Sequence, residues 1–402
     1  MDRCDVLIVG GGPAGSSCAL GLRAADLEVV VLDRATFPRG KVCAGWITPQ
    51  ILEELRIDAA DYAAGGRVIQ PIRGFRLSRL GGREVTVDHG ETVSYGIRRC
   101  EFDEHLLQRS GARLRLGEPV REIRREDARF IVNDEISAPV LVGAGGHFCP
   151  VARHLGAQPG REDATVIARE IELAMTAEER RACPVRPEIP ELYFTPDLCG
   201  YGWVVVKNGW LNVGLGRQDP SSFPAHVEAF IGWLVERGRV PAGVSRGVKG
   251  HAYLLYDQAP RPLAGDGVLL VGDAAGLAYN PSGEGIRPAV ESGLLAARAI
   301  AAAGRASDRM AQDGYATAVR ARFGRRYGRM RAGLTSVLPR AWRGPVAGRL
   351  MTNRWVARHL VVDRWFLHRH DPPLPAIPPL TGTARVSTPV LAGPAARHSR
   401  SM

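Results

Sequence analysis

The chain has 402 residues, which is more than one simple hydrophobic core organises, so its length predicts two domains. The hydrophobic content of 45% is ordinary for a globular protein, and no apolar run approaches the roughly 20 residues that span a bilayer. The net charge of +11 comes almost entirely from arginine, since three of the 53 basic residues are lysines. No nucleic-acid-binding motif accompanies this charge, so a nucleic-acid partner is not expected.

The ends of the chain and its cysteines predict a cellular setting. Asp2 and Arg3 lead straight into the first predicted strand, so no secretory signal peptide is expected. The seven cysteines are scattered, without a C-x-x-C pair or the spacing of a metal site. These features predict a reducing, cytoplasmic location and no metal centre.

The first predicted elements are a buried parallel strand over 6–9 and a helix over 14–25. The turn between them places Gly10, Gly12 and Gly15 at G-x-G-x-x-G spacing, as dinucleotide binding requires. Gly10 permits the tight turn, Gly12 lets the backbone approach a pyrophosphate, and Gly15 lets the helix pack on the strand. The pyrophosphate is then expected at the helix N-terminus, where free N–H groups favour negative charge.

A second strand over 28–32 ends at Asp33, 18 residues after Gly15, where an acid can bind a ribose hydroxyl. The glycines alone would also fit a turn without a ligand. The two strands, the helix and the acid together predict a dinucleotide site.

The rest of the chain alternates predicted strands and helices, and the pattern changes near residue 160. A glycine-bounded loop over 36–48 precedes short strands, and a strand over 140–142 leads into a second glycine-rich turn. From about residue 160 to 260 the pattern is that of a sheet-dominated α+β unit, with a hairpin over 203–215. A buried strand over 267–271 then returns the chain to the nucleotide-binding domain.

That last strand is followed by Asp273 and a long alanine-rich helix over 285–303. An acid just past a strand can hold a ribose or ribitol hydroxyl, and a glycine-rich helix start can stabilise negative charge on a reduced flavin. The GDAAG segment alone would also fit a strand-end turn. Together with the N-terminal glycines it predicts a flavin dinucleotide.

Three separated motifs now occur in the order typical of one superfamily: GGGPAG at 10–15, RCEFD at 99–103 and GDAAG-x4-P-x-GEGI at 272–286. On these residues the chain resembles the flavoprotein monooxygenase and geranylgeranyl reductase superfamily, over roughly residues 4–305. The resemblance implies FAD as cofactor and an α/β fold like that of para-hydroxybenzoate hydroxylase. In that fold a Rossmann-like FAD-binding domain is interleaved with a β-sheet-based α+β substrate domain, here followed by C-terminal helices.

The resemblance also divides the chain. It implies a discontinuous FAD-binding domain at 1–70, 96–155 and 262–305, and a substrate domain at 71–95 and 156–261. A helical, arginine-rich segment is expected at 306–370. The tail at 371–402 is rich in Pro, Ala, Ser and Thr and is predicted to be disordered.

The cofactor-binding residues follow by position from the family motifs. The ADP end corresponds to Gly10, Gly12, Pro13, Ala14, Gly15, Asp33 and Arg34, and Arg99 matches an arginine that contacts FAD. The ribityl and isoalloxazine end corresponds to Asp273, Gly276, Pro281, Gly283, Gly285 and Ile286.

Two stretches favour the geranylgeranyl-reductase-like branch. Residues 40–45, GKVCAG, resemble its K-x-C-G-G element, with Ala44 in place of a glycine. Residues 201–216 resemble its Y-x-W…K…N-V-G-x-G hairpin, with two valines in place of F-P. The W-x-W-x-I-P motif of flavin-dependent halogenases is missing from the sequence, which argues against halogenation. Gly145 stands where many aromatic hydroxylases carry an acid linked to NADPH handling, so the electron donor, NADPH or NADH, stays open.

A flavin carries the hydride or the oxygen, so the protein must supply an apolar cavity and a proton donor. Cys43 is the candidate donor, with a buried apolar role as the alternative. Lys41 either anchors an anionic substrate or lies on the surface. Tyr201 and Trp203 either line the substrate pocket or pack in the core.

The leading functional prediction is an FAD-dependent oxidoreductase that reduces or dehydrogenates C–C bonds of a hydrophobic substrate, such as a prenyl, lipid or polyketide-like chain. The first alternative is an FAD-dependent monooxygenase that hydroxylates an aromatic or quinol-like compound. The second is a redox-responsive flavoprotein without turnover.

The arginine-rich segment allows two interpretations. Residues 320–369 hold thirteen arginines and one acid, and their apolar positions approximate one helical face: Val346, Leu350, Ala357, Leu360, Val361 and Trp365. Such a helix could lie on an anionic membrane, which would suit a lipid substrate and a peripheral location. Alternatively, it covers the substrate domain and keeps its arginines in solvent.

Overall fold

The computed structural model describes residues 1–158, 165–219, 221–241, 243–244, 249–259, 261–280, 282–304, 308–324 and 353–377. Pro281, predicted above to bind FAD, lies outside the described residues, as do Val346 and Leu350. No helix among the described residues is long and apolar enough to cross a membrane.

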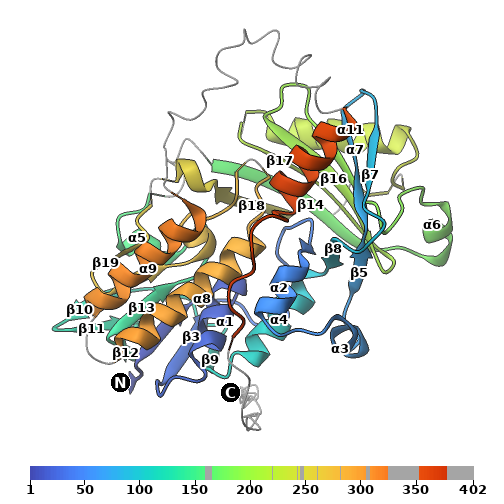
Figure 1. Ribbon diagram of the computed structural model, residues 1–402. Coiled ribbons are helices and arrows are strands. Elements are labelled where there is room, and N and C mark those ends of the chain that lie inside the picture. The colour runs from blue at the N-terminus through green and yellow to red at the C-terminus, as the bar shows by residue number, and fades with distance from the viewer. Residues whose placement is uncertain are drawn as a thin grey trace, which may run out of the picture.

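A six-stranded sheet with the order β19-β20-β13-β2-β3-β9 forms the core of the nucleotide-binding part (Figure 1). All strands but the edge strand β19 run parallel. The bounds are β2 Val6–Val9, β3 Val29–Asp33, β9 Arg113–Leu116, β13 Val140–Gly143, β19 Ala264–Gly265 and β20 Val268–Leu270. The buried apolar runs predicted from the sequence therefore meet in one sheet, from three separate parts of the chain.

Helices cover this sheet because small residues let their backbones approach. Helix α8 (Ile286–Ala303) crosses α1 (Pro13–Leu22), and a Cβ on Gly293 would lie 2.2 Å from the Ala14 carbonyl oxygen. Helix α9 (Asp308–Phe323) packs beside α8 (Figure 1). The short α5 (Pro150–His154) follows β13.

Two small sheets flank the parallel sheet. One has the order β1-β12-β11-β10, with bounds Asp2–Arg3, Ile136–Ala138, Arg129–Val132 and Ile123–Glu126. The other has the order β4-β8-β5, with bounds Trp46–Ile47, Ser94–Ile97 and Ile69–Ile72. Helices α2 (Pro49–Glu54), α3 (Ala59–Ala64) and α4 (Arg99–Arg109) lie around the second. Strand β8 leads directly into α4 and so places the start of that helix.

A seven-stranded sheet with the order β18-β14-β17-β16-β15-β6-β7 forms the second main layer. Its bounds are β6 Gly74–Arg79, β7 Val85–Asp88, β14 Thr165–Ala174, β15 Glu191–Phe194, β16 Gly200–Lys207, β17 Trp210–Arg217 and β18 Lys249–Leu254. Strands β16 and β17 form the hairpin that the sequence predicts. The short α6 (Ala177–Ala182) follows β14. Helix α7 (Phe223–Glu236) packs on one face, against Val204, Leu211 and Val213.

The opposite face of this sheet is covered by the C-terminal segment, α11 (Arg354–Val356) and the π-helix η4 (Ala357–Phe366) (Figure 1). Val361 and Phe366 are buried in one cluster with Phe75 and Trp203, whereas Arg358 is exposed. For residues 353–367 the apolar face therefore covers the substrate sheet, and a membrane cannot use that face.

The predicted disordered tail begins too early, because residues 371–377 are held against the FAD-binding part. Arg287 at the start of α8 donates to the carbonyl oxygens of His368 and Asp371 at 3.1 and 3.0 Å. Glu54 accepts from the Leu374 amide at 2.8 Å. Hydrogen bonds of this kind fix residues 371–377 without regular secondary structure, and a prediction from composition cannot identify them.

Candidate active site

A cavity of about 830 Å³ lies between the parallel sheet and the seven-stranded sheet. It is lined by the glycine-rich turn after β2, the loop at 39–46, the start of α8 and one face of the substrate sheet. Of the predicted cofactor residues that the structure describes, all but Gly15 and Gly276 line it. Cys43, Lys41, Tyr201 and Trp203 line it as well.

Gly15 and Gly276 serve backbone packing instead of cavity lining. A Cβ on Gly15 would lie 1.9 Å from the Gly10 carbonyl oxygen, so the helix could not approach its strand. Gly276 has φ +69°, and its Cβ would lie 2.5 Å from that of Ala259. The predicted role of Gly15 in helix packing fits this geometry, whereas direct cofactor contact by either glycine does not.

The ADP end of the cavity is a cradle of backbone and charge. Asp33, at the end of β3, accepts from the amides of Gly11 and Ala35 at 2.7 and 2.8 Å. Gly12 faces the guanidinium of Arg39, whose Nη2 would lie 3.1 Å from a Cβ at that position. A bare backbone at a helix N-terminus, with a cation opposite, fits a pyrophosphate. The sequence motifs did not identify Arg39, which lies in a loop without a family pattern at that position.

One buried carboxylate holds two arginines at this cradle. Asp103 on α4 receives two 2.8 Å hydrogen bonds from Arg99 and lies 3.3 Å from Arg39. Arg99 and Asp103 are four residues apart, so they face each other on one side of the helix. The RCEFD motif thus supplies both the cavity arginine and its counter-charge.

Lys41, His251 and Asp273 form a cluster where the loop at 39–46, strand β18 and the segment after β20 meet. Lys41 Nζ lies 2.9 Å from His251 Nε2 and 3.2 Å from Asp273 Oδ2, and Nε2 lies 3.1 Å from that same oxygen. Burial and the Lys41 charge lower the pKa of His251 to about 4, so the ring is neutral near pH 7. A neutral ring can make one of its two Nε2 contacts as a hydrogen bond, depending on the tautomer.

Lys41 also keeps Asp273 ionised. Burial acts to raise the pKa of Asp273, but Lys41 and the His251 hydrogen bond hold it well below its usual range. Asp273 is therefore an acceptor, as a residue that binds a ribityl hydroxyl must be. The sequence placed Lys41 here as a substrate anchor or surface residue; the structure pairs it with the acid instead. His251 was not predicted.

The start of α8 closes the other end of the cavity. Gly283 has φ +70°, and a Cβ there would lie 2.3 Å from the Tyr253 hydroxyl. Gly285, Ile286 and the first turn of the 18-residue helix face the cavity. Its N-terminus favours negative charge, as on a reduced flavin ring. The residues present therefore fit FAD at the ribose, pyrophosphate and ring ends.

The substrate end is apolar and aromatic. The Tyr201 hydroxyl donates to the Ser282 carbonyl oxygen at 2.6 Å, which joins the substrate sheet to the glycine motif. Trp203 donates through Nε1 to Asn212 Oδ1 at 2.7 Å, and a Cβ on Gly214 would lie 2.1 Å from the indole. Asn212 and Gly214 in the hairpin motif thus receive the tryptophan and leave room for it.

The Cys43 thiol lies at this end, partly buried, and its Sγ accepts from the Gly45 amide at 3.4 Å. Burial raises its pKa, and the Arg99 guanidinium opposes that rise. The thiol is therefore protonated near neutral pH and has two donors ready to stabilise a thiolate.

Comparison with known proteins identifies an FAD-dependent oxidoreductase. Residues 5–100 match the FAD-dependent oxidoreductase family. Menaquinone reductase of Mycobacterium tuberculosis is 32% identical over 323 residues, which cover 74% of this chain and 77% of the relative. Geranylgeranyl diphosphate reductase of Rhodobacter capsulatus is 28% identical, with 75% of each chain covered. A geranylgeranyl bacteriochlorophyll reductase-like structure from Thermoplasma acidophilum has a TM-score of 0.71 at 22% identity and covers 88% of this chain and 92% of its own. The predicted fold class is therefore confirmed.

Proposed function

Because the chain belongs to the geranylgeranyl-reductase-like family of FAD-dependent oxidoreductases, which includes the mycobacterial menaquinone reductase, we propose that it reduces a carbon–carbon double bond in the prenyl chain of a quinone or lipid. The observation that carries this proposal is a protonated thiol, Cys43, at the junction of an FAD cradle and an apolar, aromatic wall. We assign Cys43 the role of proton donor to a substrate that would lie between the flavin ring and the substrate sheet.

Reduction of a double bond takes up a hydride and a proton. Bound FAD, once reduced, supplies the hydride. The Sγ–H bond of Cys43 breaks as the new C–H bond forms, and the thiolate is stabilised by the Gly45 amide and by Arg99. The thiolate regains a proton from solvent when product leaves, so Cys43 returns to its starting state and each cycle takes up one proton from water.

The wall around Cys43 supports a prenyl substrate. Trp46, Tyr201 and Trp203 line the cavity that Cys43 also lines, and the two tryptophans are buried in one apolar cluster with Phe366 of the C-terminal π-helix. Branched methyl groups of an isoprenoid chain gain free energy by leaving water for such a surface. NADPH or NADH is proposed as the source of electrons for FAD, although Gly145 offers no acidic side chain at the cavity.

The test uses the FAD-loaded enzyme, reduced anaerobically and given a prenylated menaquinone. Cys43→Ala should lower single-turnover product formation by about 10²–10⁴-fold, the usual contribution of a positioned acid. Cys199→Ser, outside the cavity, is the matched control and should retain turnover. Equal turnover in Cys43→Ala and wild type would remove the assigned role. In a parallel reaction under air, oxygen incorporation into the product would identify the monooxygenase alternative.

A further inference from the structure

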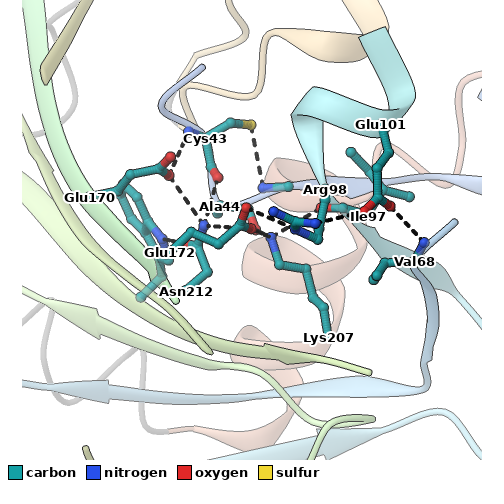
Figure 2. A network of polar contacts seen from close by, with 12 residues as sticks. Cys43, Ala44, Val68, Ile97, Arg98, Glu101, Glu170, Glu172, Lys207 and Asn212 are labelled. Carbon is teal, nitrogen blue, oxygen red and sulfur yellow. Dashed lines mark hydrogen bonds and ion pairs between the residues drawn. The ribbon is translucent and has the colours of Figure 1, made fainter. Parts of the chain in front are cut away.

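A buried polar network lies directly beneath the loop that carries Cys43 (Figure 2). Its four side chains come from one face of the substrate sheet: Glu170 and Glu172 on β14, Lys207 on β16 and Asn212 on β17. Alternate residues of a strand share a face, and the register pairs Glu172 with Asn212. Polar groups in so buried a place need partners, and here the loop supplies them.

The network holds the loop by its backbone. Glu170 Oε2 accepts from the Cys43 amide at 2.6 Å, and Asn212 Nδ2 donates to the Cys43 carbonyl oxygen at 3.2 Å. Lys207 Nζ donates to the Ala44 carbonyl oxygen at 3.2 Å and to that of Ile97 at 3.0 Å. Lys207 also pairs with Glu172 at 2.7 Å. Both backbone groups of the cysteine are therefore fixed from the sheet.

Two opposite charges flank the cysteine. The Arg99 guanidinium contacts the thiol side, and the Glu170 carboxylate contacts the backbone side. In Figure 2 the sulfur points away from Glu170, so this carboxylate does not exchange a proton with Sγ directly. Its influence passes through the hydrogen bond to the amide and through its charge, which acts against that of Arg99.

We propose that Glu170 is a positioning residue for Cys43, which fixes the cysteine backbone by a charge-assisted hydrogen bond and counters Arg99 so that the thiol keeps its proton. The consequence for turnover rests on the proposed function above. The effect on the thiol itself does not, because it can be measured without substrate.

The groups around Glu170 determine the pH above which its carboxyl group is ionised. Burial raises its pKa to about 7, the Cys43 hydrogen bond and Lys207 oppose that rise, and Glu172 adds to it. Lys249 on β18 stands opposite Glu170 in the sheet register. Above pH 7 the carboxylate is charged, and this is the range in which a thiol begins to ionise.

The test is the pH dependence of Cys43 alkylation by iodoacetamide in the FAD-loaded protein, followed peptide by peptide with mass spectrometry. Glu170→Gln keeps an oxygen that can accept from the Cys43 amide but removes the charge. The alkylation midpoint of Cys43 should fall by about one pH unit, because Arg99 is no longer opposed. The half-buried Cys199 provides an internal reference in the same digest.

The matched control is Glu172→Gln, which removes the neighbouring carboxylate of the same strand; Glu172 contacts Lys207 and Arg98. Its Cys43 midpoint should equal that of the wild type. An unchanged midpoint in Glu170→Gln, or an equal fall in both variants, would overturn the proposal. If Glu170→Gln does not yield folded flavoprotein, the wild-type midpoint still tests the proposal. Burial and Glu170 together should hold it above that of a free thiol, about 8.5; a value at or below this would mean that Arg99 dominates and would overturn the proposal.

Discussion

Asp103→Asn tests how much the FAD cradle depends on one buried carboxylate. In the wild type Asp103 receives two hydrogen bonds of 2.8 Å from Arg99 and an ion pair of 3.3 Å from Arg39. The side chains of Asp103 and Arg99 are 0% and 8% exposed, so water replaces little of what is lost. Asparagine keeps the volume but offers a single acceptor to three contacts, and its NH₂ group faces donors.

The expected cost is about 3–5 kcal/mol of unfolding free energy, the range for removing one partner of a buried ion pair. Urea unfolding followed by circular dichroism measures it. Asp2→Asn is a matched control, because Asp2 also receives two hydrogen bonds from one arginine, Arg113, but at the surface. That change should cost roughly 0–1 kcal/mol. Equal losses in the two variants would refute the assigned importance of burial at Asp103.

Three further changes test other parts of the site. Arg39→Ala should weaken FAD binding by about 10- to 100-fold through loss of a charged contact to the pyrophosphate, as measured by flavin fluorescence titration; unchanged affinity would remove Arg39 from the cradle. Gly214→Ala should cost about 1–3 kcal/mol, because its methyl group overlaps Trp203; full stability in urea would contradict that packing. The pKa of His251 is about 4, below its ordinary 6.5, so the unfolded chain binds a proton that the folded chain does not, and stability falls as pH drops through that window. Lys41→Met should raise this pKa, and an unmoved histidine signal in an NMR titration would be the contrary result.

The parts of this molecule that could be predicted from sequence are those encoded locally. The strand, glycine turn and helix at 6–22 and the acid at Asp33 follow from spacing and periodicity within one short segment. The hairpin that carries Tyr201 and Trp203 follows in the same way, and both side chains line the cavity.

The unpredicted residues are those brought together by long-range folding. His251 is 210 residues from Lys41, and Glu170 is 127 residues from Cys43. Alternation along β14 reveals that Glu170 and Glu172 share a face, but not whether that face meets water or a buried loop. Likewise, the apolar face of residues 357–366 fits a membrane and a sheet equally well until the sheet is placed.

The most direct test of the function is an anaerobic single turnover of the reduced, FAD-loaded enzyme with a prenylated menaquinone. Mass spectrometry of the product should show the gain of one hydride and one proton at a prenyl double bond, together with reoxidation of the flavin. A flavin that stays reduced and a substrate of unchanged mass would contradict prenyl reduction as the activity of this site.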